Sequence, residues 1–175
     1  GSAVPRDCAG AFGRRMGLLR ADPRDSPMLT EASAEEIRAG FTCALPASVD
    51  NTAGLPPVGN QGSQGSCVAF SVGYYHATYI ENQENPFDLN DPANQVSPAF
   101  IYNHINGGVD GGAYFEDAAN FIMGHGACSM AEMPYNQGDF TTWPSDDWKY
   151  VSALRRRASC AYWINVSDAQ GIDAL

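Results

Sequence analysis

The chain has 175 residues, of which 44% are hydrophobic, and this is enough for one domain with a packed core. Its 10 Lys and Arg residues stand against 20 Asp and Glu residues, which gives a net charge of -10. This balance argues against nucleic acid as a partner, because phosphate binding requires a basic surface. No stretch approaches the roughly 18 apolar residues of a transmembrane helix, so we expect no membrane span.

Residues 1–44 show weak hydrophobic periodicity and a turn-rich stretch at 21–27. We interpret this segment as a leader, similar to a propeptide, that lies over the site described below and limits access to it. A flexible leader without that role is the alternative.

The most informative segment is a glycine-rich loop, residues 59–66, that leads directly into Cys67 and an apolar run. Apolar residues after the cysteine recur at helical spacing, which predicts a helix that begins at Cys67 and is buried on most sides. They form two rows: Val68, Val72, Tyr75 and Tyr79, and beside them Ala69, Gly73, His76 and Ile80.

A cysteine at the start of a helix has the chemistry of a nucleophile. The helix dipole and the unpaired N–H groups of the first turn favour the thiolate, which is the attacking species. Gln61 lies six residues upstream and could donate its amide N–H to an oxyanion, with the Cys67 N–H as second donor. The alternative is a small apolar side chain without chemistry, as for most buried cysteines.

Further elements follow in chain order. Residues 81–95 are rich in Asn, Asp and Pro and are predicted to form an exposed loop. Serine followed by proline is typical of a helix start, and it predicts a helix over about 97–105. We also predict a helix over about 112–123, a strand over 158–166, and a new helix that begins at Ser167.

Three sequence blocks resemble the papain-like cysteine proteases. Residues 60–71 resemble the active-site segment of that family. Residues 96–100, followed by residues 107–115, are similar to its Leu-Ser-Glu-Gln segment and its Gly-Cys-Asn-Gly-Gly loop, and residues 131–136 are similar to its Tyr-Pro-Tyr turn. The blocks occur in the order of the family, and the resemblance covers roughly residues 45–175.

The resemblance implies an α+β fold with two subdomains. A helical subdomain over 45–150 would carry the nucleophile, and a β-barrel-like subdomain would start over 151–175. The implied activity is that of a bacterial-type cysteine endopeptidase, which hydrolyses peptide bonds through a thioester acyl-enzyme. The family uses no cofactor, and we expect no metal site because the cysteines are widely spaced.

The resemblance also implies the roles of individual residues. Cys67 would be the nucleophile and Gln61 the side chain of the oxyanion hole. Gly111 and Gly112 would present backbone groups to an extended peptide or protein substrate, and Tyr114 would help line a specificity pocket.

The chain departs from the family at two features: one disulfide, and the histidine that acts as general base in catalysis. Gln64 and Val109 stand where the family has two bridged cysteines, so both halves of the bridge are absent. The histidine of the family follows the cysteine by about 130 to 150 residues. We therefore expect the histidine and its asparagine partner beyond residue 175, with this chain as the N-terminal portion.

The three histidines of the chain are not expected to replace that base. His76 lies nine residues along the helix from Cys67, which is roughly 13 Å and about half a turn away. His104 and His125 are expected to be structural or exposed to solvent.

Two other readings remain open: a cysteine-dependent acyl or amide transferase acting as an effector, and a catalytically inactive binding module. The pairing of Cys8, Cys43, Cys128 and Cys160 is also open. The compartment is not fixed by the sequence, and we favour a secreted or periplasmic location over the cytoplasm.

Overall fold

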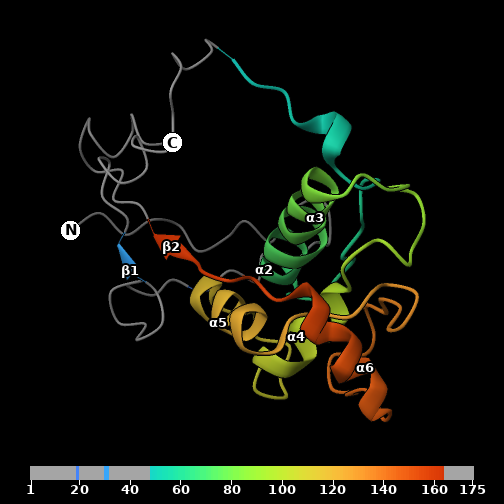
Figure 1. Ribbon diagram of the computed structural model, residues 1–175. Coiled ribbons are helices and arrows are strands. Elements are labelled where there is room, and N and C mark those ends of the chain that lie inside the picture. The colour runs from blue at the N-terminus through green and yellow to red at the C-terminus, as the bar shows by residue number, and fades with distance from the viewer. Residues whose placement is uncertain (1–18, 20–29, 32–47, 164–175) are drawn as a thin grey trace, which may run out of the picture.

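The computed structural model describes residues 19, 30–31 and 48–163. The elements in chain order are β1 (Thr30–Glu31), η2 (Thr52–Gly54), α2 (Cys67–Ala69), η3 (Phe70–Ala77), α3 (Thr78–Glu84), α4 (Pro98–Ile105), α5 (Phe115–His125), α6 (Asp147–Ala153), η4 (Leu154–Arg156) and β2 (Tyr162–Trp163). Helices α4, α5 and α6 lie together on one side of a long helix, called the central helix below (Figure 1).

The central helix consists of α2, η3 and α3, which follow one another without a break. It begins at Cys67, as predicted. Its middle part, η3, is a wide π-helical segment, in which the Thr78 N–H reaches back five residues to the Gly73 carbonyl. Wide turns of this kind are rare in proteins and are frequently found at functional sites.

The wide segment explains why two predicted core positions are exposed. An extra residue in a turn rotates all following side chains by about 100° relative to a regular helix. His76 is exposed and Ile80 keeps 42% of its surface accessible. The prediction of burial is therefore wrong for the second row from His76 onward, whereas Tyr79 of the first row is half-buried.

The core lies between the central helix, α4 and α5. Helix α4 begins as predicted, because the Ser97 hydroxyl accepts a hydrogen bond from the Phe100 N–H (3.2 Å) and Pro98 occupies the first turn. Helix α5 begins three residues later than predicted. Gly112 has φ +99° and Tyr114 is extended, so neither continues a helix. The core cluster comprises Val68, Ala69, Val96, Phe100, Ile101, Tyr102, Ala113, Ala118, Ile122, Ala127, Cys128 and Ala153.

The expected α+β fold class is wrong, because the described residues are mainly helical. Their only regular strands are β1 and β2, which pair in parallel over two residues each. The β-barrel-like start expected from residue 151 is helical up to Arg156, because α6 buries Ala153 against the core and continues into η4.

The strand predicted over 158–166 is present only as β2, and residues 164–166 lie outside the described part of the chain. A strand is stabilised by pairing with a neighbouring strand over several residues, and β1 pairs with β2 over two residues only. Helix α3 also extends to Glu84, so the predicted loop starts at residue 85. In the described part of the chain, no helix has the length and hydrophobicity needed to cross a membrane.

Candidate active site

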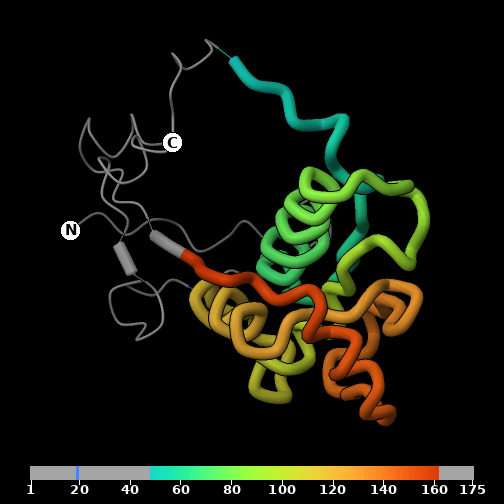
Figure 2. Tube along the Cα trace, viewed as in Figure 1, coloured from blue at the N-terminus to red at the C-terminus, as the bar shows by residue number. Residues whose placement is uncertain are grey.

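The segment before the glycine-rich loop runs along the central helix toward its amino-terminal end (Figure 2). The Tyr74 hydroxyl donates to the Pro57 carbonyl (2.8 Å), and the Gly59 N–H donates to the Tyr75 hydroxyl (2.9 Å). These contacts fix the path of the chain, so that Gln61 arrives at the end of the helix where Cys67 begins.

Cys67 is half-buried and is the first residue of the central helix, with Ser66 in the N-cap position. The Ser66 side chain does not cap the helix. The Ser66 hydroxyl lies 2.7 Å from the Tyr135 hydroxyl. Because the Tyr135 hydroxyl donates its hydrogen bond to the Gln61 carbonyl (2.9 Å), Ser66 is the donor to Tyr135. The N–H groups of the first turn therefore donate no hydrogen bond to the N-cap side chain.

The loop that carries Gln61 is held by residues 136–139. The buried Gln64 directs its amide nitrogen at three carbonyl oxygens, of Asn136, Gln137 and Asp139, at 3.2 to 3.4 Å. The Gln61 amide nitrogen donates within the loop, to the Gln64 carbonyl (3.0 Å). The predicted oxyanion donor is thus oriented by its own loop.

The glycine loop 107–112 contacts the glycine-rich loop 59–66 that precedes Cys67, called the nucleophile loop from here on. One carboxylate oxygen of Asp110 accepts hydrogen bonds from the Gly65 N–H (2.8 Å) and the Tyr102 hydroxyl (2.7 Å). The Gly112 N–H in turn donates to the Tyr102 hydroxyl (3.3 Å). Burial, followed by the hydrogen bond to Asp110, raises the pKa of Tyr102. The hydroxyl therefore stays protonated and acts as a hydrogen-bond donor to Asp110.

The predicted substrate-binding residues are placed unequally. Gly112 is buried, and its N–H donates to the Tyr102 hydroxyl, which also bonds to Asp110. Gly111 is exposed, but its N–H is engaged by the Val109 carbonyl (2.9 Å) within the loop. Tyr114 is the N-cap of α5 and keeps 36% of its surface accessible.

Asp110, Tyr102 and Tyr135 were not singled out from the sequence, although each lies within or near a block of the resemblance. An acidic residue between pairs of glycines, as in 107–112, was the available signal for Asp110.

His104 belongs to an aromatic cluster and has both ring nitrogens engaged. Its Nδ1–H donates to the Phe100 carbonyl (2.6 Å), so Nε2 accepts from the Tyr150 hydroxyl (3.0 Å). The ring stacks on Trp143, and burial lowers the pKa of His104, which keeps the imidazole neutral. His125 is exposed and stacks on the Phe121 ring of α5.

The described thiols differ in their surroundings. Cys128 is fully buried, and burial raises its pKa to about 12, which makes it a poor nucleophile. Cys160 is exposed; it lines a groove of about 560 Å³, together with His76, between the central helix and residues 155–161. Cys8 and Cys43 lie outside the described residues.

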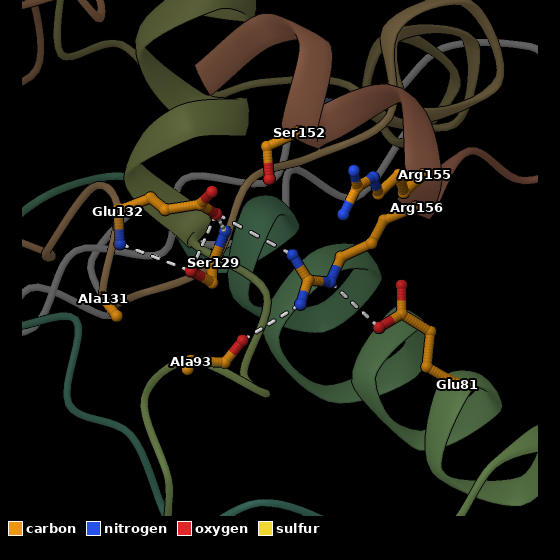
Figure 3. A pocket seen from close by; sticks show the side chains of 8 residues that line it. All are labelled: Glu81, Ala93, Ser129, Ala131, Glu132, Ser152, Arg155 and Arg156. Atoms are coloured by element: carbon orange, nitrogen blue, oxygen red, sulfur yellow. Dashed lines mark hydrogen bonds and ion pairs between the residues drawn. The ribbon is translucent and has the colours of Figure 1, made fainter. Parts of the chain in front are cut away.

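A second pocket, of about 450 Å³, is crossed by Arg156 (Figure 3). Its guanidinium donates to Glu81 (3.0 Å) and to the Ala93 carbonyl (3.0 Å) and lies 3.8 Å from Glu132. Arg156 thereby holds η4 against α3 and the neighbouring loops.

The two carboxylates of this pocket differ in pKa. Burial raises the pKa of Glu81, despite the opposing charge of Arg156. Burial acts in the same direction on Glu132, but hydrogen bonds from Ser152 and Ser129 outweigh it and lower the pKa of Glu132. The charges are compensated inside the pocket.

Among the described residues, no group of three His, Cys, Asp or Glu side chains could hold a metal ion.

No protein-family model matches the chain, and no curated protein does. Its structure is similar to the crystal structure of xylellain, a cysteine protease from Xylella fastidiosa, with a TM-score of 0.61 and 25% sequence identity. The chain shares its fold with a cysteine protease. The match covers 99% of this chain and 65% of xylellain, so the chain spans about two thirds of the length of that protein. The similarity supports the papain-like assignment at the level of a cysteine protease.

Proposed function

We propose that the protein of which this chain is part is a papain-like cysteine endopeptidase. Cys67 attacks the carbonyl carbon of a peptide bond as thiolate, the amine leaves with a proton, and water hydrolyses the resulting thioester. The observation that carries the proposal is the structural similarity to a cysteine protease, in a chain whose central helix starts at Cys67.

The oxyanion of the tetrahedral intermediate forms at the amino-terminal end of the central helix. The Cys67 N–H and the Gln61 side-chain amide supply its two donors, and removing one such donor typically costs about 3 to 4 kcal/mol of transition-state stabilisation. The uncapped first turn supports this role, since the Ser66 hydroxyl is directed at Tyr135 instead.

The proton acceptor in this proposal is a histidine beyond residue 175, oriented by an asparagine. His104 is unsuited, because both of its ring nitrogens are engaged and burial lowers its pKa. His76 is exposed and lies nine residues beyond Cys67, at least about two turns along the central helix.

The substrate in this proposal is an extended peptide or protein chain that lies along the glycine loop. Gly111, Gly112 and Tyr114 are the proposed contacts: the glycines through backbone groups, and Tyr114 through a side-chain pocket. We divide the chain into a leader, 1–44, and a body over 45–150 that carries the nucleophile.

The leader is proposed to lie over this substrate path. The backbone N–H of Leu19 donates to the Ala113 carbonyl (3.0 Å), directly after Gly112. A backbone hydrogen bond at this place is the kind of contact an extended substrate would make.

Replacing Leu19 by proline removes that donor, whereas Leu19→Ala keeps it. We expect Leu19→Pro to increase the rate of Cys67 labelling by a peptidyl epoxide about threefold or more, and Leu19→Ala to change it less. The rate is measured by intact-protein mass spectrometry. Equal labelling rates in the wild type and both variants would contradict the proposed position of the leader.

The proposed function is tested with the full-length protein and two probes. A peptidyl epoxide should add one equivalent, mapped to Cys67 by peptide mass spectrometry, and a fluorogenic dipeptide amide should be hydrolysed. Labelling without hydrolysis, but with transfer of the acyl group to an added amine, would indicate a transferase. Neither labelling nor hydrolysis would indicate an inactive homologue and would refute the proposal.

A further inference from the structure

We propose that Asp110 is a positioning residue for the nucleophile, and that its hydrogen bonds replace the disulfide that the family resemblance would place between positions 64 and 109. The inference rests on the proposed function, because its catalytic consequence is the placement of Cys67 and of the oxyanion donors.

The hydrogen bond between Gly65 and Asp110 lies one residue after each of the two positions, 64 and 109, at which the family has its bridged cysteines. Gly65 follows Gln64, Asp110 follows Val109, and the Gly65 N–H donates to the Asp110 carboxylate at 2.8 Å. Hydrogen bonds in which the acceptor is ionised are roughly twice as strong as neutral ones. The two loops, 45 residues apart in sequence, are thus joined where the bridge would have joined them.

The residues at the former bridge positions have turned to other partners. Gln64 is buried and bonds to the carbonyls of residues 136–139, and Val109 keeps 63% of its surface accessible. Neither side chain could hold the two loops together, so the connection depends on Asp110.

Tyr102 makes the connection rigid. Its buried hydroxyl donates to the same Asp110 oxygen (2.7 Å) and accepts from the Gly112 N–H (3.3 Å). One carboxylate oxygen therefore links helix α4, the glycine loop and the nucleophile loop. A side-chain carboxylate held by two donors has little freedom to move, and neither do the backbones it joins.

The packing at Gly65 leaves little room for the loop to shift. A Cβ atom there would lie 3.1 Å from the Gly112 nitrogen and the Tyr102 hydroxyl, and 3.2 Å from the Asp110 oxygen. Gly65 is two residues before Cys67, so a displacement of Gly65 moves the thiol and its N–H together. A misplacement of about 1 Å at an active site can cost about 100-fold in rate.

The test compares Asp110→Ala with Asp110→Asn in the full-length protein. The asparagine keeps an oxygen that can accept from Gly65 and Tyr102, whereas alanine has none. We expect Asp110→Ala to lower kcat by 10- to 100-fold with KM changed less than about threefold. Asp110→Asn should retain kcat within about fivefold of the wild type. Asp88→Ala, at an exposed aspartate of the loop before α4 that bonds to Asn90, is the matched control and should leave both constants unchanged.

Tyr102→Phe provides a second variant in case Asp110→Ala does not fold. It removes one donor to Asp110 but keeps the aromatic ring in the core, and we expect kcat to fall about 3- to 10-fold. A kcat within twofold of the wild type in a folded Asp110→Ala, or in Tyr102→Phe if only that variant folds, would overturn the inference. So would a loss of kcat in Asp110→Asn as large as in Asp110→Ala.

Hydrogen exchange at the Gly65 amide separates this inference from the proposed function. We expect exchange at Gly65 to accelerate at least tenfold in Asp110→Ala, or in Tyr102→Phe if that variant alone folds, with α4 unchanged. If the wild type hydrolyses no peptide, the proposed function fails, and the Gly65 exchange rate alone decides on Asp110. Unchanged exchange at Gly65 would then overturn the inference.

Discussion

The Cys67→Ala variant of the full-length protein is expected to hydrolyse peptide amides at least about 10⁴-fold more slowly than the wild type. Alanine cannot form the thioester, so the whole covalent pathway is lost rather than one contribution to it. The residual rate comes from binding and oxyanion stabilisation alone. The measurement is kcat/KM with a fluorogenic peptide. The free energy of unfolding of the variant serves as a check on folding.

Cys160→Ser is the matched control, because Cys160 is the exposed thiol among the described cysteines. It should retain kcat/KM within about twofold. The buried Cys128 should resist alkylation in the folded protein, since burial raises its pKa to about 12. A Cys67→Ala variant that stays active while Cys160→Ser loses its activity would indicate Cys160 as the nucleophile and contradict our proposal.

Replacing Gly126 by alanine is expected to lower the free energy of unfolding by about 3 kcal/mol or more. Gly126 ends α5 with φ +71° and ψ -158°, a backbone conformation almost restricted to glycine. A Cβ atom added there would also lie 1.9 Å from the Ala153 carbonyl oxygen. Backbone conformation and packing therefore act in the same direction, and either α5 or α6 must move.

Gly124→Ala, two residues earlier, is the control for this substitution. Gly124 lies inside α5, and a Cβ atom there would meet nothing within 4 Å. Alanine in a helix interior is more favourable than glycine by about 0.5 to 1 kcal/mol, so this variant should be slightly more stable. Both free energies are obtained from denaturant unfolding. Similar values for the two variants would mean that the contact between Gly126 and Ala153 is not as described.

Local signals in the sequence predicted local structure well. Ser97 and Pro98 place the start of α4 correctly, because capping depends on residues only three positions apart. The start of the central helix at Cys67 is also correct. The wide segment after Phe70 has no comparable signature, and this is why the burial of His76 and Ile80 was predicted wrongly.

Contacts between residues far apart in the chain could not be predicted from the sequence. The fold class was wrong because strand pairing is long-range: β1 and β2 are more than 130 residues apart and pair over two residues only. For the site, the motif around Cys67 and Gln61 is local and could be recognised. The bond between Gly65 and Asp110 joins residues 45 positions apart, and no pattern in one sequence specifies it. The roles of Cys67, Gln61, Gly111, Gly112 and Tyr114 remain predictions.

The attachment of the Cys67 loop to the glycine loop has a chemical consequence for the environment in which the protein can work. Thiol enzymes need a reductant to keep the attacking sulfur from oxidising. In a protein whose loops are joined by a disulfide, strong reductant endangers the scaffold as well. Here Asp110 accepts hydrogen bonds from an amide N–H and a phenol hydroxyl, and neither group exchanges electrons with thiols. Millimolar dithiothreitol should therefore protect the nucleophile without loosening its support.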